Sequence, residues 1–483
     1  MNVPDSDTNK KLPSLTLSVL PLVFLVGMLV YVIRTFGTDA LSGPSQTALL
    51  LTSGFIVALG YFTHHLTYDS FVSAFSEKIG GVAQSIVILL FIGALSGTWM
   101  VSGIVPSLIY YGMQVLDPEW FLVTASGICA VISVMTGSSW TTIATIGVAM
   151  LGIGKALGFD EGWIAGAIIT GAYFGDKISP LSDTTVLASS CTGTPIFTHI
   201  RYMLITTIPS FTISLLIFLF AGFFVQHGTE ADATIFAEGL TKTFNITPWL
   251  FIVPVVTVFM IIRKIPSEAV LFLATLLACV AALIFQQDLL IQLSEATGGT
   301  VSQLRSCFSA IFSGASPETG NAELNSLVST SGMSGMMDTI WLILCAMIFG
   351  GAMTASGFLM SITNAFVRLA HSTFSLVTST VGSGLFINTV CADQYLSIIL
   401  ISSMFGESYR ERGYESRLLS RTTEDSVTVT SVLIPWNTCG MTQATVLGVA
   451  TFTYLPYCFF NYISPVMSML VAAIGYKIVR RKN

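Results

Sequence analysis

The chain has 483 residues, of which 53% are hydrophobic and only 10% are charged, and its formal net charge is −6. Ordinary soluble domains carry about 25% charged residues, so this composition cannot supply the polar surface of a soluble protein. The long uncharged runs instead predict an all-α polytopic membrane protein, in contact with the lipid bilayer and without a nucleic-acid partner.

About ten membrane-spanning helices are predicted from the apolar runs. They lie near residues 15–36, 46–63, 83–112, 162–190, 202–225, 247–262, 267–286, 338–368, 420–440 and 456–476. Two further apolar stretches, 120–157 and 373–405, are interrupted by polar residues. We expect each of them to enter the membrane and return as a re-entrant hairpin.

Lysine and arginine gather on one side of the membrane in this scheme. The basic groups lie at residues 10–11, 263–264, 410–421 and 477–482. The positive-inside rule makes this side cytoplasmic, so residues 1–14 form a cytoplasmic tail and both termini lie inside. The external linker 226–246 and the loop 287–336 then face outward. We expect a multi-pass protein of the cytoplasmic (inner) cell membrane.

The two halves of the chain, 15–225 and 247–483, contain similar segments. The aligned pairs are "GALSGTWMVSGIV" (93–105) with "MIFGGAMTASGFL" (347–359), and "GSSWTTI" (137–143) with "ADQYLSI" (392–398). Because each half has an odd number of predicted spans, the second half would be inverted relative to the first. Inverted repeats with broken helices recur among secondary transporters, whose sites lie near the midplane of the bilayer.

Four polar segments break the apolar pattern, two in each half. They are "MTGSSWTT" (135–142), "GDKISPLSDTT" (175–185), "NTVCADQYLS" (388–397) and "TEDSVTVTSVLIPWNTCG" (423–440). They predict hairpin tips and breaks in the helices 162–190 and 420–440. A membrane tolerates broken backbone only where it is buried in protein or lines a cavity. Its freed carbonyls, with nearby hydroxyls and carboxylates, are the oxygen ligands that hard cations prefer.

The carboxylates and hydroxyls of these segments form the candidate site. The cation- or proton-binding candidates are Asp176, Asp183, Ser138, Ser139, Thr184, Asp393, Glu424 and Asp425, and sodium is expected at the first four of them. The supporting or substrate-binding candidates are Lys177, Ser182, Gln394, Thr428, Asn437 and Thr438. The alternative to an ion site is a static ion pair of Lys177 with Asp176 or Asp183.

A buried carboxylate holds a cation or a proton but not both comfortably, because burial favours its protonated form and a bound cation favours its ionised form. This competition is the simplest chemistry for exchanging sodium against protons, and it needs no cofactor beyond the transported ion. His199 and Arg201 flank the start of a predicted span, and we expect them to contact headgroups or loops.

The same segments resemble the NhaC family of sodium/proton antiporters. The motifs that carry the resemblance are "GSSWTTIATIG" (137–147), "GAYFGDKISPLSDTT" (171–185), "HIRYMLITTIPS" (199–210), "ADQYLSI" (392–398) and "SRTTEDSVTVTSVLIPWNTCG" (420–440). The resemblance implies the fold of the ion-transporter superfamily, with two inverted repeats that each contain a re-entrant hairpin and a broken helix. The hairpin tips would lie at residues 138–139 and 393–394. It also implies a homodimer that works by an elevator motion. The sequence departs from the family pattern at Val186, Val427 and residues 401–403, which bears on the substrate.

Three functions compete at this point. The leading hypothesis is a secondary active transporter that exchanges sodium for protons by alternating access. The alternative is a sodium-coupled transporter of a small organic solute, an amino acid or a carboxylate. Polar groups that suit it are Ser402, Ser403, Gln394, Asn437 and Thr438. An intramembrane enzyme ranks far lower, because the sequence has no nucleophile–base pair or metal motif with suitable spacing.

Overall fold

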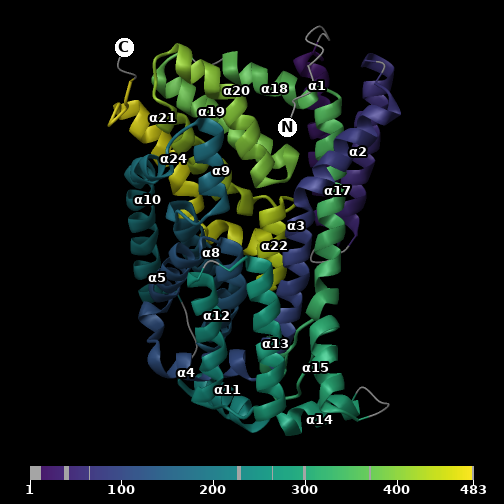
Figure 1. The fold of residues 1–483 in the computed structure, drawn as a ribbon, viewed down its shortest axis with the longest axis vertical. Coiled ribbons are helices and arrows are strands. Elements are labelled where there is room, and N and C mark those ends of the chain that lie inside the picture. The colour runs from purple at the N-terminus through teal and green to yellow at the C-terminus, as the bar shows by residue number, and fades with distance from the viewer. Residues whose placement is uncertain are drawn as a thin grey trace.

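The computed structural model describes residues 12–36, 43–64, 66–225, 230–263, 265–296, 301–368 and 371–480. The regular secondary structure of these residues is helical, apart from one isolated β-bridge between Tyr414 and Arg480. Eight of their helices are long and apolar enough to cross a membrane, and two bent pairs raise the number to ten. The protein is therefore the all-α polytopic membrane protein that the sequence predicts (Figure 1).

The first half contains eleven helical elements among the described residues. They are α1 (Leu15–Phe36), α2 (Pro44–His64), α3 (Tyr68–Val101), α4 (Ile104–Val115), α5 (Pro118–Thr136), α6 (Ser139–Thr142), η2 (Ile143–Gly147), α7 (Val148–Ala156), α8 (Glu161–Ile178), α9 (Asp183–Thr192) and α10 (Ile196–Phe224). The bounds of the predicted span 83–112 are wrong, because α3 begins at Tyr68 and a break separates it from α4. Gly103 makes this break with a φ of +79°, a conformation that glycine adopts at little cost.

The predicted external linker, 226–246, contains α11 (Glu230–Thr243). The elements that follow are η3 (Pro248–Phe251), α12 (Ile252–Ile262), α13 (Ser267–Phe285), α14 (Gln287–Ala296), α15 (Gln303–Phe312), α16 (Ala322–Val328), η4 (Gly332–Met336), α17 (Met337–Ala355), α18 (Phe358–Arg368), α19 (Thr373–Cys391), α20 (Gln394–Glu411), α21 (Ser416–Thr423), η5 (Glu424–Thr428), η6 (Ser431–Leu433), α22 (Thr438–Leu447), α23 (Thr451–Tyr454), η7 (Leu455–Tyr457) and α24 (Phe459–Ile474).

Short helices occupy much of the region 287–336, where the sequence predicts only a loop. A Cβ atom on Gly97 would lie 1.9 Å from the carbonyl oxygen of Ala310, so α15 packs directly on the backbone of α3. Ser306 Oγ donates a hydrogen bond to the carbonyl oxygen of Leu290, at 2.5 Å, and ties α15 to α14. Tertiary packing of this kind stabilises helices that are too short to be stable alone.

Residues that begin or end helices recur in the two halves at positions that are 255 residues apart. Positions 137 and 392 are one such pair. Left-handed residues that follow helices recur as Gly137 and Ala392, Gly158 and Gly413, and Gly193 and Gly448. N-cap residues recur as Asp117 and Ser372, Ser138 and Asp393, Asp160 and Glu415, and Ser182 and Asn437. These pairs support an internal repeat, and the inversion of the second half stays a prediction.

Figure 1 places the two termini toward the same end of the molecule, together with α18, α20 and α21. At the opposite end lie α11, α14 and α15. The predicted external segments thus lie away from the termini, in the arrangement that the basic residues predict. Which end faces the cytoplasm stays a prediction, and the basic residues at 10–11, 264 and 481–482 lie outside the described residues.

Small residues bring α8 into close contact with α5. A Cβ atom on Gly171 would lie 2.0 Å from the carbonyl oxygen of Ser126, and one on Gly175 would lie 2.5 Å from that of Ala130. Such glycines allow two helix backbones to approach closely inside a membrane. The contact places the last turn of α8 beside the tip that follows α5.

Candidate functional site

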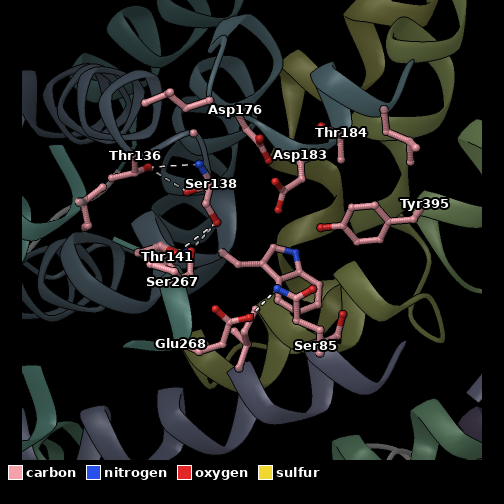
Figure 2. A pocket seen from close by; sticks show the side chains of 18 of the residues that line it. Ser85, Thr136, Ser138, Thr141, Asp176, Asp183, Thr184, Ser267, Glu268 and Tyr395 are labelled. Carbon is pink, nitrogen blue, oxygen red and sulfur yellow. Dashed lines mark hydrogen bonds between the residues drawn. The ribbon is translucent and has the colours of Figure 1, made fainter. Parts of the chain in front are cut away.

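A cavity of about 680 Å³ lies where five parts of the fold meet (Figure 2). They are the middle of α3, the tip between α5 and α6, the break between α8 and α9, the turn between α12 and α13, and the start of α20. Five of the predicted site residues line this cavity: Ser138, Asp176, Asp183, Thr184 and Gln394.

Asp176 lies in the last turn of α8 and is only 5% exposed. Its Oδ2 accepts hydrogen bonds from the backbone N–H of Ser139 at 3.2 Å and from Ser139 Oγ at 2.7 Å. Its Oδ1 accepts a bond from Ser182 Oγ at 2.6 Å, and that hydroxyl lies 2.9 Å from Thr184 Oγ1. The carboxylate therefore joins the first hairpin tip to the break in the next helix, through charge-assisted bonds stronger than neutral ones.

The break between α8 and α9 follows from its sequence. Pro180 has no backbone N–H and cannot continue the hydrogen-bond ladder of α8. Ser182 starts α9 as its N-cap, because its Oγ accepts a hydrogen bond from the backbone N–H of Thr185 at 3.4 Å. A Cβ atom on Gly137 would lie 2.6 Å from the carbonyl carbon of Leu181, so the hairpin tip rests against the break.

Asp183 begins α9 and is exposed to the cavity, where Figure 2 shows its carboxylate pointing inward. It forms no hydrogen bond or ion pair with another described residue. Ser138, at the hairpin tip, accepts bonds from the backbone N–H and the hydroxyl of Thr141, each at 3.2 Å. Carboxylate and hydroxyl oxygens therefore converge on one space, and hard cations prefer such ligands.

Two cavity residues were missed by sequence reasoning. Tyr395 points its hydroxyl toward the space that Asp183 faces (Figure 2). Glu268 lies on the opposite wall, where its Oε1 accepts a hydrogen bond from Gln84. The available signal for Glu268 was a carboxylate in the predicted span 267–286. Such carboxylates are usually functional.

Lys177 does form an ion pair, but its partner is Asp425 of η5 and not Asp176 or Asp183. Both side chains are fully buried. Lys177 Nζ also donates to Ser464 Oγ at 2.8 Å, and Thr206 Oγ1 donates to Asp425 Oδ1 at 3.0 Å. The predicted alternative, an ion pair of Lys177 with Asp176 or Asp183, is therefore wrong. The ammonium group of Lys177 instead pairs with a carboxylate of the second half of the chain.

Asp393 lies in the turn between α19 and α20, and the predicted residues around it are buried. Asp393 caps α20 by accepting a hydrogen bond from the backbone N–H of Leu396 at 2.9 Å, and it accepts another from Thr438 Oγ1 at 3.2 Å. Asn437 is the N-cap of α22. Of the predicted residues in this group, Gln394 lines the cavity.

The second half repeats the central contact of the first without its charge. Ser431 and Gln394 lie 255 positions after Asp176 and Ser139, and Ser431 Oγ donates to Gln394 Oε1 at 3.2 Å. The corresponding bond in the first half is the 2.7 Å contact of Ser139 with Asp176. The site is therefore asymmetric, with the ionisable member in the first half.

Three other predicted residues, Glu424, Asp425 and Thr428, lie in η5. They are fully buried and do not line the cavity. Arg421, which the charge pattern places with the cytoplasmic basic residues, is also fully buried, with its guanidinium 4.7 Å from the ring of Tyr202. These contacts pair residues from distant parts of the chain, which a count of charges along the sequence cannot detect.

His199 is likewise buried, and its Nδ1 shares a hydrogen bond with Ser420 Oγ. The expectation that it contacts headgroups or loops is therefore wrong. Its position near the start of a predicted span gave no sign that α21 would cover it.

The profile of the Na+/H+ antiporter family matches residues 5–190 and 171–476. The chain belongs to this family. The resemblance to NhaC proteins is thereby confirmed, and the fold and cavity described above are those of a Na+/H+ antiporter family member.

Relatives of this family member extend over most of its length. It is 36% identical over 406 residues to the Na(+)/H(+) antiporter NhaC of Alkalihalophilus pseudofirmus, which covers 84% of this chain and 85% of that protein. It is 33% identical to the malate-2H(+)/Na(+)-lactate antiporter of Bacillus subtilis, over 96% of both chains. It is 31% identical to the arginine/ornithine antiporter ArcD of Halobacterium salinarum, over 98% of this chain and 94% of that protein.

The departures from the family pattern lie around the site and not in it. Val186 is exposed on α9, one turn after Asp183, and Val427 is buried in η5. Ser402 and Ser403 line a second cavity between α9, α20 and α21. None of these residues lines the cavity that holds Asp176.

Proposed function

We propose that this Na+/H+ antiporter family member exchanges sodium for protons by alternating access. Sodium would bind between Asp176, Asp183, Ser138 and Ser139. The observation that carries the proposal is the position of Asp176, whose carboxylate bridges the hairpin tip and the helix break at the edge of an acidic cavity. The relatives named as sodium/proton antiporters support the same function.

Proton exchange follows from the chemistry of this carboxylate. A metal-type ligand must be ionised to bind a cation, so sodium binding releases a proton and proton binding releases sodium. Ser139 and Ser182 donate to the ionised carboxylate, and they can also orient their own oxygens toward a bound cation. The same small set of atoms can therefore serve both ions in turn.

The proposal also includes the motion and the assembly that the family resemblance implies. These are two inverted repeats with re-entrant hairpins, cytoplasmic termini, and an elevator motion within a homodimer. The 255-residue spacing of the caps supports the repeats. The first arms of the hairpins, α5 and α19, have 19 residues each and are long enough to cross a membrane. Their length therefore does not distinguish a crossing helix from a re-entrant one, and the re-entrant path is part of the proposal.

Sodium binding across pH tests the exchange. Apparent sodium affinity, measured by calorimetry on purified protein, should fall as pH falls, because protons compete for the carboxylate. Proteoliposomes should show proton release from the lumen when sodium enters. Binding that does not change with pH, together with no proton movement, would contradict the proposal.

The size and charge of the cavity favour a second candidate function, sodium-coupled transport of a small organic solute. A volume of about 680 Å³ far exceeds a sodium ion and lies in the range of ligand pockets, roughly 300–1,000 Å³. Its lining carries the carboxylates of Asp176, Asp183 and Glu268, and among the described lining residues there is no lysine, arginine or histidine. Such a lining suits a cationic solute better than a carboxylate.

The names of two relatives include organic solutes, malate with lactate and arginine with ornithine. Calorimetry of sodium binding, repeated with each of these four solutes, separates the two functions. By reciprocal linkage, a coupled solute changes the affinity of the protein for sodium, and sodium changes the affinity of the protein for that solute by the same factor. Sodium binding that is independent of pH but tightens with one solute would select this second function.

A further inference from the structure

Three polar residues follow one face of α21 and η5 at one-turn intervals, namely Ser416, Ser420 and Glu424. Residues four apart share a face of a helix, and each turn rises about 5.4 Å. Ser416 lines the second cavity, which has a volume of about 410 Å³, and its Oγ accepts a hydrogen bond from Thr194 Oγ1 at 2.9 Å. The row therefore begins at a cavity that is separate from the acidic one.

His199 lies beside the middle of this row. It is fully buried on α10, its Nδ1 shares a hydrogen bond with Ser420 Oγ, and its Nε2 has no partner among the described residues. One face of α10 follows the same path, because Tyr202 lies under the guanidinium of Arg421 and Thr206 donates to Asp425. One ring nitrogen of the imidazole is thus hydrogen-bonded, and the other has no hydrogen-bond partner among the described residues.

Glu424 ends the row inside the protein. It is fully buried, and neither carboxylate oxygen has a hydrogen-bond partner among the described residues. A buried carboxylate without donors is far less costly as the neutral acid than as the anion. The surrounding charges act in both directions, because Lys177 favours the ionised carboxylate whereas Asp176 and Asp425 favour the neutral acid. These opposed effects suit a carboxyl group that gains and loses a proton.

We propose that protons travel between the second cavity and Glu424 through Ser416, Ser420 and His199, along a route separate from the acidic sodium cavity. This inference rests on the sodium/proton exchange proposed above and adds Glu424 as a second proton-binding carboxylate, coupled to Asp176 through Lys177. A neutral imidazole accepts a proton at one nitrogen and releases one from the other, so its charge is restored after each transfer. Water between the turns completes the route, since buried polar groups without protein partners commonly bind water.

Lys177 links the end of this route to the sodium site. It pairs with Asp425, the neighbour of Glu424, and it directly follows Asp176 in the last turn of α8. A proton on Glu424 changes the net charge around Lys177 and so the strength of its pair with Asp425. That change acts on the same helix turn that holds the sodium ligand.

Two transport assays on the full-length protein test the route. Sodium-driven proton movement is followed with a pH dye inside proteoliposomes, and sodium/sodium exchange is followed with radioactive sodium at equal pH on both sides. His199→Gln, Ser420→Ala and Glu424→Gln should each slow sodium-driven proton movement on the order of tenfold or more, since each removes a proton-transfer group. In His199→Gln and Ser420→Ala, sodium/sodium exchange needs no proton transfer and should stay within about twofold of the wild type.

His371→Gln is the matched control, because His371 is an exposed histidine that lines neither cavity, and both of its rates should be unchanged. Equal loss of both rates in His199→Gln and in Ser420→Ala would show a structural role and overturn the route. Wild-type proton movement in His199→Gln would overturn it as well. No proton movement in the wild type would instead contradict the proposed exchange, and the route with it.

Discussion

Asp176 and Asp183 face the same cavity but are held differently, and their variants should therefore differ. Asp176 accepts three hydrogen bonds, whereas Asp183 forms none with described residues. Asp176→Asn removes the charge and disrupts the bridge between tip and break, so sodium transport should fall at least about tenfold, the effect of losing one charge-assisted bond. Asp183→Asn should cost less.

Radioactive sodium uptake into proteoliposomes measures this difference, with the amount of inserted protein determined for each variant. Asp288→Asn is the control, because this carboxylate is exposed on α14 and lies away from the cavity. Wild-type uptake by both cavity variants would remove the site.

In the buried pair of Lys177 and Asp425, each charge should stabilise the protein mainly by offsetting the cost of burying the other. Asp425→Asn leaves a buried ammonium group without a counter-charge and should lower the free energy of unfolding by about 3–5 kcal/mol. The double variant Lys177→Met with Asp425→Leu removes both charges of this pair and should recover part of that loss, because the buried guanidinium of Arg421, 3.7 Å from Asp425, also loses its counter-charge. Unfolding in mixed micelles measures both values, and a double variant that loses more than Asp425→Asn alone would contradict the pairing.

The residues of the first half of the site could be predicted from the sequence, and their partners in the second half could not. Asp176, Ser139 and Ser182 stand in polar segments that interrupt apolar runs, which is a local signal. The partner of Lys177 lies 248 positions away, and no local pattern indicates it. Arg421 was assigned to a basic loop because the positive-inside rule counts charges by their neighbours in sequence.

The two hairpin tips have the same backbone shape but different residues at the left-handed position. Gly137 has a φ of +68° and Ala392 a φ of +56°. Ala392→Gly relieves the strain of a side chain there and should leave stability unchanged or raise it by up to about 1 kcal/mol. Gly137→Ala should lower stability by more than about 2 kcal/mol, because its Cβ would also meet the backbone of Leu181.

Thermal unfolding of the two purified variants, side by side with the wild type, measures this contrast. Equal effects of the two substitutions would show that the tips are not equivalent in shape. The turns after α5 and α19 and the helix breaks could be predicted because glycine, proline and capping residues act locally. The start of α3 and the short helices α14 and α15 could not, because packing between distant segments decides them.

Cys191 reports on the sidedness of the whole molecule. Of the eight cysteines, all of which the structure describes, it alone is exposed, and it lines the second cavity. The helices α20 and α21, which share this cavity, lie toward the end of the molecule where the termini lie (Figure 1). If that end is cytoplasmic, an impermeant thiol reagent should label Cys191 in inside-out vesicles and not in intact cells.

The variant Cys191→Ser should abolish this labelling and so identify the reacting thiol. Labelling of the wild type in intact cells would reverse the assigned orientation.

The link between Lys177 and Asp425 also has a consequence for the order in which the protein is made. The ribosome completes Lys177 first and must add 248 residues before its counter-charge exists. At about 5–20 residues per second, this takes roughly 12–50 s. During that interval the first half holds an ammonium group with no carboxylate from η5 to neutralise it. We therefore expect the end of α8 to reach its final place in the membrane late, after residue 425 of the 483 has been synthesised.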